Sequence, residues 1–400
     1  MSPALSSRLP RVALIGVTGY GGIYLQLVRE ALAKKAINLV AAVIINRDQA
    51  REAVDELIAA GTTIYANFEE FIAHETGKID LCLIPVGIQW HARLTIGALQ
   101  AGMNVLVEKP LAGSLVDVAA IRRAEAESGR WVAVGFQDLY AIEARWLKKQ
   151  LLSGVIGQVK EVRMIGLWPR PRSYFSRNHW AGRISADGAA VLDSPLNNAF
   201  AHFVNLALFF AGKQEDTSAP CSIDSADLFR AHRIEMFDTA VVRGHCPTGT
   251  RFWFGVSHAT SVTRQPEIAI RGSDGQAEWW HEQRCVVINV AGKRQVFRLP
   301  STEESRQLMF SSVLARLSDP TSFICTSEIA EQHTRFIERV QEAATVRAFP
   351  ASSIDWISEP DTRSEIPSVH GLADALGQAF LDGLPIGSTS PFAPAELASR

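Results

Sequence analysis

Cysteine is scarce in this sequence and never occurs in a paired spacing. The five cysteines are Cys82, Cys221, Cys246, Cys285 and Cys325, and no two of them form a C-x-x-C motif. An odd count without metal-ligand spacing predicts reduced, mostly packed thiols and a cytoplasmic protein rather than a disulfide-bonded scaffold. The ten histidines show no metal-ligand spacing either, so no metal site is predicted.

Long apolar runs and a strong net charge are also missing. The longest apolar run, residues 199–211, is interrupted by His202 and Asn205 and is too short to span a bilayer. The first ten residues lack the apolar core of a signal peptide and predict a loose arm. A formal net charge of −2 gives no general attraction to nucleic acid or to an anionic membrane, so neither is an expected partner.

The rest of the composition is that of an ordinary globular chain. Its 400 residues, with 47% apolar and 20% charged content, are enough for two large domains. Strands are predicted at residues 12–15, 39–45, 79–84, 104–108 and 131–135, and helices at 23–34, 49–60, 91–101 and 115–128. This alternation predicts an α/β domain with a parallel sheet wound on both sides by helices.

A glycine-rich turn joins the first predicted strand to the first helix. It contains Gly16, Thr18, Gly19, Tyr20, Gly21 and Gly22, in a G-x-x-G-x-x-G spacing with one extra glycine. Glycines let the backbone turn tightly and approach a pyrophosphate, whose charge then lies at the helix N-terminus. At the head of a β/α array, this turn predicts dinucleotide binding.

The second predicted strand ends without an acid at its first polar position. Dinucleotide-binding units that take NAD usually place an acid there to hold the ribose 2′-hydroxyl. Asn46 takes that position here, and Arg47 follows. Because a neutral side chain removes repulsion and a guanidinium pairs with phosphate, we predict a preference for NADP over NAD. Asp48 would reverse this prediction by turning inward.

The fourth predicted strand ends in an acid, an amine and a proline. Glu108 and Lys109 are residue types that are rarely buried, yet they directly follow an apolar strand. Pro110 holds the residue before it in an extended conformation. An ordinary solvent-exposed loop explains these residues, but the flanking β/α units favour a ligand site, because ligands bind at the carboxyl edge of parallel strands.

Three further motifs accompany the glycine turn. They are Ile84-Pro85 followed by His91, the segment 101–111 with its A-G-x-x-V-x-x-E-K-P-L pattern, and Val134-Gly135-Phe136. Together they resemble the glucose-fructose oxidoreductase, inositol dehydrogenase and MocA (Gfo/Idh/MocA) family over residues 11–350. The glycine spacing departs from the family's usual G-x-G-x-x-G and is similar to that of some semialdehyde and acyl-phosphate reductases. Those reductases use a nucleophilic cysteine, for which no cysteine here has the context.

The resemblance implies an N-terminal Rossmann domain that binds NAD(P) and a C-terminal α+β domain with an open, mostly antiparallel sheet. It also implies sugar-like substrates, a peptide bond before Pro110 that is often cis, and a catalytic or substrate-orienting role for Lys109. The expected cofactor-binding residues are Gly16, Thr18, Gly19, Tyr20, Gly21, Gly22, Asn46, Arg47, Pro85, His91, Glu108, Lys109, Gln137 and Trp180.

A loop at residues 168–183 is dense in aromatic and arginine side chains. A proline-fixed surface loop would account for this composition, whereas the resemblance implies a lining of the substrate cleft. Trp180 and Gly182 match a W-R-G motif of the family, but Ala181 replaces the arginine. The expected substrate contacts are Trp168, Arg170 and Tyr174, with Arg177 and Arg183 as alternatives for an anionic or hydroxylated substrate.

Polar residues interrupt an apolar helix that the pattern predicts from Asn198 to Gly212. Asn198, His202 and Asn205 lie on one face of that helix. Each buried polar group left unpaired costs about 1–3 kcal/mol, so these groups must be hydrogen-bonded or line a cavity. A core histidine satisfied by its neighbours is the simpler explanation, but the resemblance aligns the three with a D/N-x-x-x-H-x-x-D pattern. Asp193 is the alternative acid, and Asn197 is a further expected substrate contact.

Short strand-like runs separated by turns recur between residues 221 and 299, as in an antiparallel sheet with helices on one face. The resemblance implies that its other face forms a homodimer or homotetramer, with Trp253, Trp279 and Trp280 as contributors. The predicted domains are an arm at 1–10, a Rossmann domain at 11–138, an α+β domain at 139–355 and an extension at 356–400 with one helix near 372–381.

These observations predict an NAD(P)-dependent oxidoreductase that transfers a hydride between nicotinamide and a secondary alcohol or ketone of a sugar, polyol or related substrate. His202 is expected to be the general acid/base, because free histidine titrates near neutrality, and Lys109 to polarise the reacting oxygen. These two roles are interchangeable. Asn198 or Asp193 would orient His202 or a substrate hydroxyl. The alternatives are a non-catalytic nicotinamide-binding regulator, and lyase or glycosidase chemistry with transient oxidation by NAD.

Overall fold

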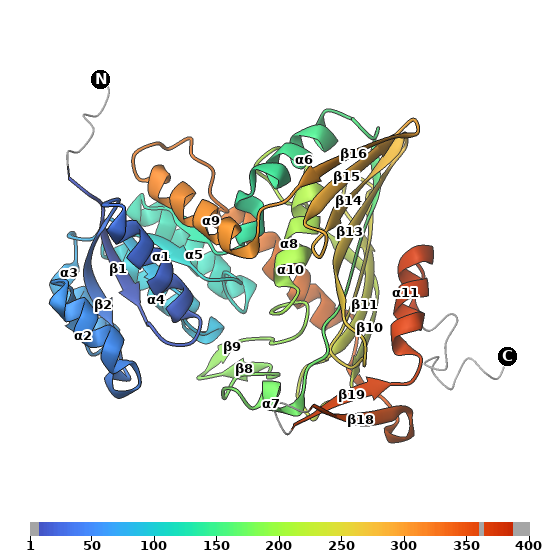
Figure 1. The fold of residues 1–400 in the computed structure, drawn as a ribbon, viewed down its shortest axis with the longest axis horizontal. Helices are drawn as coiled ribbons and strands as arrows, with labels where there is room; N and C mark the ends of the chain where they lie inside the picture. Colours follow the sequence, from blue (N-terminus) through green and yellow to red (C-terminus); the bar gives the residue numbers. More distant parts are fainter. Residues whose placement is uncertain (1–7, 360–363, 387–400) are drawn as a thin grey trace. The chain divides into compact units, whose positions relative to one another are not determined.

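The computed structural model describes residues 8–359 and 364–386 (Figure 1). The chain forms two compact units: unit 1 comprises Met1–Ala141 and Thr302–Glu331, and unit 2 comprises Ile142–Ser301 and Gln332–Arg400. Residues 302–331 therefore rejoin unit 1 late in the chain, which no feature of the sequence pattern indicated. Residues 1–7 of the predicted arm and 387–400 of the predicted extension lie outside the described residues. No helix within the described ranges combines the length and the apolar character that a bilayer crossing requires.

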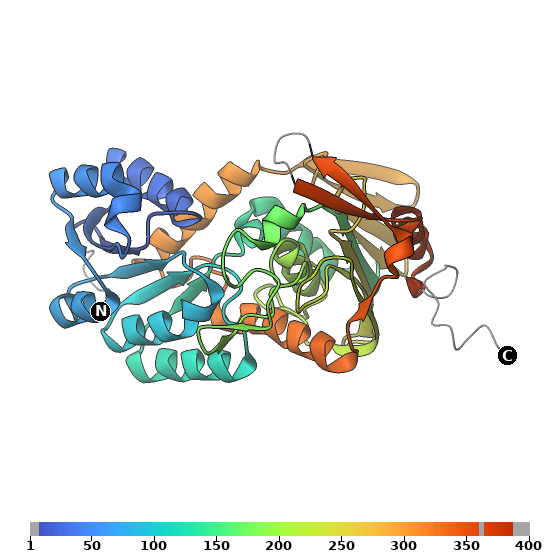
Figure 2. The ribbon, with the colours of Figure 1, turned by 90° about the horizontal axis from the view of Figure 1, so that it is seen from below.

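Unit 1 is built on a six-stranded parallel sheet in the order β3-β2-β1-β4-β5-β6. Figure 2 shows helices on both faces of this sheet, which explains why every residue of β4 and β5 is buried. The strands are β1 (Arg11–Ile15), β2 (Asn38–Val43), β3 (Thr63–Tyr65), β4 (Leu81–Ile84), β5 (Asn104–Val107) and β6 (Val132–Val134). The helices are α1 (Gly21–Ala33), η1 (Arg47–Ala50), α2 (Arg51–Ala59), α3 (Phe68–Glu75), α4 (Ile88–Gln100), α5 (Leu115–Ser128), η2 (Gln137–Tyr140) and α9 (Thr302–Arg316). The predicted doubly wound sheet is confirmed.

The sequence pattern missed the segment that contains β3 and α3. β3 has only three residues, too few for a pattern of alternation to be recognised. α3 follows Asn67, whose side chain accepts a hydrogen bond of 2.8 Å from the backbone N–H of Glu70. An asparagine N-cap is a recognisable start signal for a helix, so this element could have been found.

Unit 2 is built on a nine-stranded sheet in the order β16-β15-β14-β13-β7-β12-β11-β10-β17. The pairs β7–β12 and β10–β17 are parallel and the others are antiparallel, which confirms the predicted open, mostly antiparallel sheet. Its strands are β7 (Val159–Leu167), β10 (Ser222–Arg230), β11 (Thr239–His245), β12 (Arg251–Ser257), β13 (Arg264–Gly272), β14 (Gly275–Trp280), β15 (Cys285–Val290), β16 (Lys293–Arg298) and β17 (Arg347–Ala348). The other strands form two hairpins, β8 (Ser185–Ala186) with β9 (Ala189–Ala190) and β18 (Ile354–Glu359) with β19 (Ser364–Val369). The helices are α6 (Ile142–Leu152), α7 (Arg172–Phe175), α8 (Ala201–Phe210), η3 (Ala351–Ser353) and α11 (Leu372–Asp382), while α10 (Ser327–Ala343) spans the boundary between the units.

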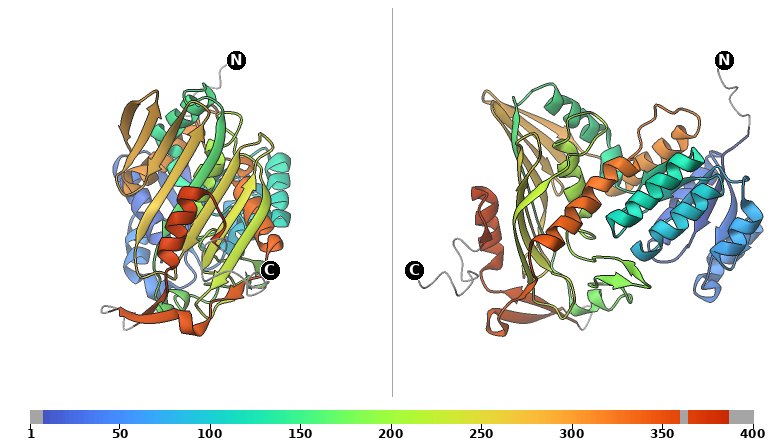
Figure 3. Two further views of the ribbon diagram at one scale, coloured as in Figure 1. Left: turned by 90° about the vertical axis from the view of Figure 1, so that its right-hand side faces the viewer. Right: turned by 180° about the vertical axis from the view of Figure 1, so that it is seen from behind.

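Different helices cover the two faces of the nine-stranded sheet. Phe336 of α10 packs against Phe252 and Phe254 of β12, and α8 contacts β7 and β13. Figure 3 shows α11 lying across the strands on the opposite face, where Leu372 and Leu376 are fully buried. Both faces of the central strands therefore contribute to the apolar core of unit 2.

Two side chains of the sheet bind the C-terminal end of α11. Arg163 Nη1 donates to the carbonyl oxygens of Phe380 and Leu381, both at 2.6 Å, and Arg163 Nη2 pairs with Glu161 at 2.7 Å. A cation at a helix C-terminus is favoured by the helix dipole. Trp253 Nε1 donates to the carbonyl oxygen of Leu384 at 2.9 Å. The segment that ends in α11 is thus held by specific contacts as well as by its apolar face.

The three tryptophans expected at a subunit interface have different environments. Trp253 is 1% exposed and lies under α11, with its ring against Phe380. Trp279 is 3% exposed and faces the other way, toward Phe210 of α8. Neither ring is therefore open to a second subunit, and the prediction that placed Trp279 on the outer face is wrong. Trp280 is half-buried.

Candidate functional site

Backbone geometry requires glycine at three positions of the turn before α1. Gly16 and Gly19 have φ values of +87° and +56°, in the left-handed region that other residues rarely adopt. A Cβ on Gly21 would lie 2.7 Å from the carbonyl oxygen of Gly16, whereas one on Gly22 would make an ordinary 3.7 Å contact with that of Val17. Since α1 begins at Gly21, the close approach that brings a helix N-terminus to the turn belongs to Gly21.

The turn lines a cavity of about 330 Å³ within unit 1. The predicted cofactor residues Gly16, Thr18 and Asn46 contribute to it. Sequence reasoning missed its other polar and aromatic lining residues, which are Asn67, Phe68, Glu69, Trp90 and Arg93. The cavity is built from residues at and after the carboxyl ends of β1, β2, β3 and β4, which is the edge where a doubly wound sheet binds its ligand.

Polar side chains at and near this cavity already have partners within unit 1. Glu69 forms an ion pair with Arg93, whose guanidinium lies 5.8 Å from the centre of the Trp90 ring. Arg47 Nη2 donates to the carbonyl oxygen of Ile64 at 3.1 Å. Asp48, which could have turned inward, is exposed and pairs with Arg51 at 2.8 Å.

Glu108 and Lys109 follow β5 at the same edge of the sheet as the glycine turn. Glu108 is 4% exposed and accepts hydrogen bonds from the Tyr24 hydroxyl at 2.9 Å and from the backbone N–H of Lys109 at 3.0 Å. Burial raises the pKa of Glu108, and the positive charge of Lys109 opposes this rise. A Cβ on Gly135 would lie 2.5 Å from Glu108 Oε1, so the buried carboxyl leaves room only for glycine. Lys109 itself is half-buried.

The loop that carries Lys109 is braced by His91. The Lys109–Pro110 peptide bond is cis, as the resemblance implied. The fully buried His91 ring lies between two carbonyl oxygens, with Nδ1 2.7 Å from Pro110 and Nε2 3.1 Å from Val86. Burial lowers the pKa of His91, against the effect of these carbonyls. The ring therefore links the proline loop to the loop after β4.

The remaining predicted cofactor residues lie in both units. Pro85 and Gln137 are buried in unit 1, after β4 and at the start of η2. Tyr20 is 38% exposed on the glycine turn. Trp180 belongs to unit 2 and is half-buried there. The guanidinium of Arg177 lies 3.7 Å from the Tyr174 ring centre and 5.4 Å from that of Trp180.

Asp193 is the centre of a hydrogen-bonded turn in unit 2. It is 2% exposed, and its Oδ2 accepts a 2.6 Å hydrogen bond from the backbone N–H of Gly182. Its Oδ1 accepts one of 2.8 Å from Asn198 Nδ2. The chain therefore folds back before α8, as the alternative with Asp193 required, and joins the candidate acid Asp193 and the candidate amide Asn198 in one hydrogen-bonded pair. Gly182 has a φ of +72°, and a Cβ there would lie 2.7 Å from Ile234 Cγ2.

α8 begins three residues later than predicted. The prediction of a helix from Asn198 is wrong, because residues 194–200 form turns in which Asn198 N–H donates to Ser194 and Phe200 N–H to Pro195. Asn198 is thus not on the helical face that carries His202 and Asn205. His202 is half-buried at the start of α8. The fully buried Asn205 amide has no hydrogen-bond partner among the described residues.

The expected substrate contacts form a layer of rings next to this turn. Trp168 stacks on Phe200 with ring centres 4.6 Å apart, and Arg170 lies 4.9 Å from the Tyr174 ring centre. Asn197 is 2% exposed and donates from Nδ2 to the carbonyl oxygens of Val191 and Leu192 at 2.9 and 3.2 Å. Its amide is therefore engaged by the backbone of the fold-back segment.

The described residues contain neither an activated cysteine nor a metal-binding cluster. All five cysteines are free thiols, and four of them are buried. Burial raises the pKa of Cys221 to about 12 and that of Cys246 to about 11, which disfavours the nucleophilic thiolate. No cluster of His, Cys, Asp and Glu in the described ranges has the arrangement of a metal centre.

Two family models match successive parts of the chain. Residues 11–136 match a model described as an oxidoreductase family with an NAD-binding Rossmann fold. Residues 144–278 match a GFO/IDH/MocA C-terminal domain. Inositol 2-dehydrogenase of Azotobacter vinelandii is 28% identical over 262 residues, which is 63% of this chain and 73% of that enzyme. Further curated inositol dehydrogenases match over less than half of their length, between 42% and 45%.

Solved structures share the fold. An inositol dehydrogenase homolog of Azotobacter vinelandii, complexed with NAD+, aligns with a TM-score of 0.72 and 17% identity over 86% of this chain and 97% of that one. KijD10, a 3-ketoreductase of Actinomadura kijaniata in complex with NADP and TDP-benzene, aligns with a TM-score of 0.66 and 18% identity over 86% and 100%. At these identities the likeness establishes the architecture of both units.

Proposed function

The chain belongs to the Gfo/Idh/MocA family and is an NAD(P)-dependent oxidoreductase acting on CH–OH groups, and from this premise we propose that its reaction interconverts a secondary alcohol and a ketone on a sugar, polyol or related substrate. The observation that carries the proposal is that unit 1 contains two features at one edge of its sheet. One is the glycine turn, in which Gly21 closely approaches Gly16, and the other is Lys109, which directly precedes the cis-proline after β5. The curated relatives named inositol dehydrogenases support a polyol or sugar as the substrate class.

The glycine turn fits a dinucleotide. The Gly16 carbonyl occupies the place that a Cβ at Gly21 would take, so α1 begins directly at the turn and brings its N-terminus to the carboxyl edge of the sheet. Gly16, Thr18 and Asn46 would hold the cofactor at the 330 Å³ cavity. When bound, the nicotinamide accepts or gives the hydride of the reacting carbon.

Lys109 and His202 would handle the charge and the proton. Lys109 Nζ would donate a hydrogen bond to the reacting oxygen and favour the negative charge that develops on it. The His202 imidazole would give or take the hydroxyl proton. The buried Glu108 fixes the backbone N–H of Lys109, and His91 fixes the carbonyl of Pro110, so the lysine is positioned by its own loop. Asp193 and Asn198, already paired, would orient His202 or a substrate hydroxyl.

We assign NADP as the preferred cofactor. Asn46 rather than an acid lines the cavity after β2, and Asp48 is directed to Arg51 on the surface. Arg47 would have to release the carbonyl of Ile64 to reach a 2′-phosphate. Solved structures of this fold contain NADP or NAD+, so the fold permits either cofactor and the assignment rests on Asn46 and Asp48. Comparing KM for NADPH and NADH tests this assignment, and a clear preference for NADH would contradict it.

Two further expectations belong to this proposal. The protein would act in the cytoplasm, and it would form a homodimer or homotetramer through the part of the nine-stranded sheet that α11 leaves open. Val296 of β16 is 50% exposed, and Trp280 of β14 is half-buried. Analytical ultracentrifugation of the full chain tests the assembly, and a monomer at micromolar concentration would contradict it.

The lysine assignment is tested by Lys109→Met, with the exposed Lys34→Met as the matched control. Losing a proton-handling or charge-stabilising group should lower kcat at least about 100-fold, while NADPH still binds. The assay is nicotinamide absorbance over a panel of sugars and polyols with both cofactors. A turnover as high in Lys109→Met as in Lys34→Met would refute the assignment, and a wild-type protein that turns over no polyol or sugar would refute the proposed substrate class.

A further inference from the structure

A second cavity lies wholly within unit 2, away from the glycine turn in sequence and in lining residues. Its volume is about 690 Å³, within the roughly 300–1,000 Å³ typical of small-molecule sites. Its walls come from α7, from the turn between β10 and β11, from the segment after β17 and from β18. We call it the arginine pocket, after its lining residues Arg172, Arg230 and Arg233.

The charged side chains that line the arginine pocket are all basic. Three arginines and His232 are among its twelve lining residues, and none of the twelve is an aspartate or a glutamate. Such a lining attracts an anion with several acceptor oxygens, because each guanidinium presents a fork of N–H donors. A phosphate, which carries up to two negative charges, matches three such forks better than a single carboxylate does.

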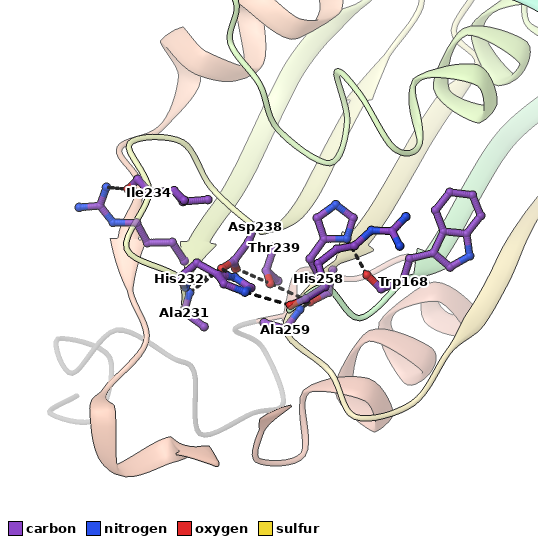
Figure 4. Close-up of polar contacts among 11 residues, drawn as sticks. Trp168, Ala231, His232, Ile234, Asp238, Thr239, His258 and Ala259 are labelled. Carbon is purple, nitrogen blue, oxygen red and sulfur yellow. Dashed lines mark hydrogen bonds and ion pairs between the residues drawn. The ribbon is translucent and has the colours of Figure 1, made fainter. Parts of the chain in front are cut away.

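The turn that carries two of these arginines is held by a buried carboxylate. Figure 4 shows Asp238 beside Ala231 and His232, and its Oδ2 accepts from their backbone N–H groups, both at 2.8 Å. His232 Nδ1 lies 2.7 Å from the same oxygen, and its Nε2 lies 3.0 Å from the carbonyl oxygen of Arg170. Asp238 is fully buried. The backbone positions of the neighbouring residues Arg230 and Arg233 are therefore fixed by the turn.

Each arginine has donors available to a ligand. Arg230 uses Nη1 on the carbonyl oxygens of Ile234 and Glu235, at 2.7 and 3.1 Å. Arg233 is exposed and has no hydrogen bond or ion pair with the described residues. Arg172 is oriented by the Trp356 ring, whose centre lies 3.6 Å away, and by an ion pair of 3.3 Å with Glu365, an exposed pair that a phosphate can displace.

Aromatic rings form the apolar part of the lining. Phe175, Phe349 and Trp356 belong to it. Phe349 is 5% exposed and already stacks on Phe229, whereas Phe175 and Trp356 are both half-buried and can meet a ligand. Rings of this kind bind flat groups by stacking. From the combination of arginines, rings and volume, we propose that the arginine pocket binds a small phosphorylated ligand that carries a planar ring, such as a nucleoside monophosphate. This site is separate from the cofactor and extends the function beyond the proposed dehydrogenation.

Calorimetric titration of the full chain tests the proposal with three probes: uridine monophosphate, inorganic phosphate and uridine. Saturating NADPH is present in each titration, so that the probe cannot occupy the glycine turn. Uridine monophosphate should bind at least about tenfold more tightly than phosphate or uridine, because only it engages both the arginines and the rings. Absence of binding by uridine monophosphate up to millimolar concentration would overturn the proposal.

Variants locate the binding. Arg233→Gln should weaken uridine monophosphate binding about tenfold, and the double variant Arg172→Gln with Arg233→Gln about 100-fold, the loss expected for charge-assisted hydrogen bonds. Arg294→Gln, on exposed β16 at the opposite edge of the sheet, removes the same charge and should leave binding unchanged. Equal weakening in Arg233→Gln and Arg294→Gln would mean unspecific attraction and would refute the site.

A variant that is expected to bind the ligand more tightly distinguishes the proposed site from a folding defect, which would only weaken binding. Glu365→Gln removes the carboxylate that competes for Arg172 and should tighten uridine monophosphate binding. Phe175→Leu should weaken uridine monophosphate while leaving inorganic phosphate unchanged, because Phe175, unlike Trp356, does not orient Arg172 and only the nucleotide carries a ring. Weaker binding in Glu365→Gln, or an equal loss for both probes in Phe175→Leu, would contradict the assigned roles.

Discussion

The glycine turn of unit 1 and the Asp193 turn of unit 2 are both tight segments next to a helix, but different interactions hold them. In the glycine turn the backbone geometry itself excludes side chains. Gly16 and Gly19 have left-handed φ values, and Gly21 lies against the carbonyl oxygen of Gly16. In the Asp193 turn a buried carboxylate holds the backbone N–H of Gly182 and the amide of Asn198. The first kind of turn should fail when a side chain is added, and the second when one is removed.

The largest expected effect comes from adding a methyl group to the glycine turn. Gly21→Ala places a Cβ 2.7 Å from a backbone oxygen that cannot move aside alone, so the turn must shift. A misplacement of about 1 Å in a binding site is enough for a loss of about 100-fold, and we expect at least this loss in kcat/KM with NADPH. Gly22→Ala is the matched control, because its Cβ would meet an oxygen only at 3.7 Å. Equal losses in the two variants would show that the close approach at Gly21 is not what the turn requires.

The second expected effect comes from removing the carboxylate of Asp193. Asp193→Ala leaves the buried N–H of Gly182 without its acceptor, and a group of this kind costs about 2 kcal/mol in the free energy of unfolding. The control is Asp224→Ala, since Asp224 forms an exposed pair with His245 whose loss should cost less than about 0.5 kcal/mol. Urea denaturation of both variants measures the difference. Equal stabilities would mean that the backbone alone holds the Asp193 turn, as it does the glycine turn.

The same contrast explains how much the sequence could predict. The glycine turn, the parallel strands and the E-K-P segment were visible because each depends on residue types at fixed local spacings. The spacing could not say that Gly21 rather than Gly22 makes the close approach, since that depends on where Gly16 O points after the chain has turned. Similarly, Asn198 has a helical spacing to His202, but its side chain binds Asp193 in a turn, and α8 starts at Ala201.

Contacts between distant segments were beyond the sequence pattern. Arg163 binds carbonyl groups 217 and 218 positions later, and nothing around residue 163 or 380 signals this contact. The arginine pocket likewise gathers Arg172, Arg233 and Trp356 from three segments that share no motif. Trp90 and Arg93 could have been suspected, because they belong to the first two turns of the helix that follows buried β4, next to the carboxyl edge where ligands bind.

The smallest expected effect concerns the other end of α8, which is also held by a side chain. Lys148 Nζ donates to the carbonyl oxygens of Phe209, Gly212 and Thr217, the last two at 2.6 and 3.3 Å, and its side chain is fully buried. Burial lowers the pKa of Lys148 from 10.5 to about 7. Between these values the unfolded chain binds one more proton than the folded chain, so this residue makes stability rise with pH.

Comparison with Lys148→Met isolates that contribution. The stability of the wild type relative to Lys148→Met should rise by about 1 kcal/mol from pH 7 to pH 8, because the cost of burying the charged amine disappears. Urea denaturation at each pH gives the two curves, and Lys149→Met, on an exposed neighbour that pairs with Glu215, supplies the background. A difference that does not change with pH would mean that the three carbonyl groups keep the amine protonated. The charged Lys148 amine would then hold the end of α8 at every pH tested. Both side-chain-held segments of unit 2 would in that case be as insensitive to pH as the backbone-held glycine turn of unit 1.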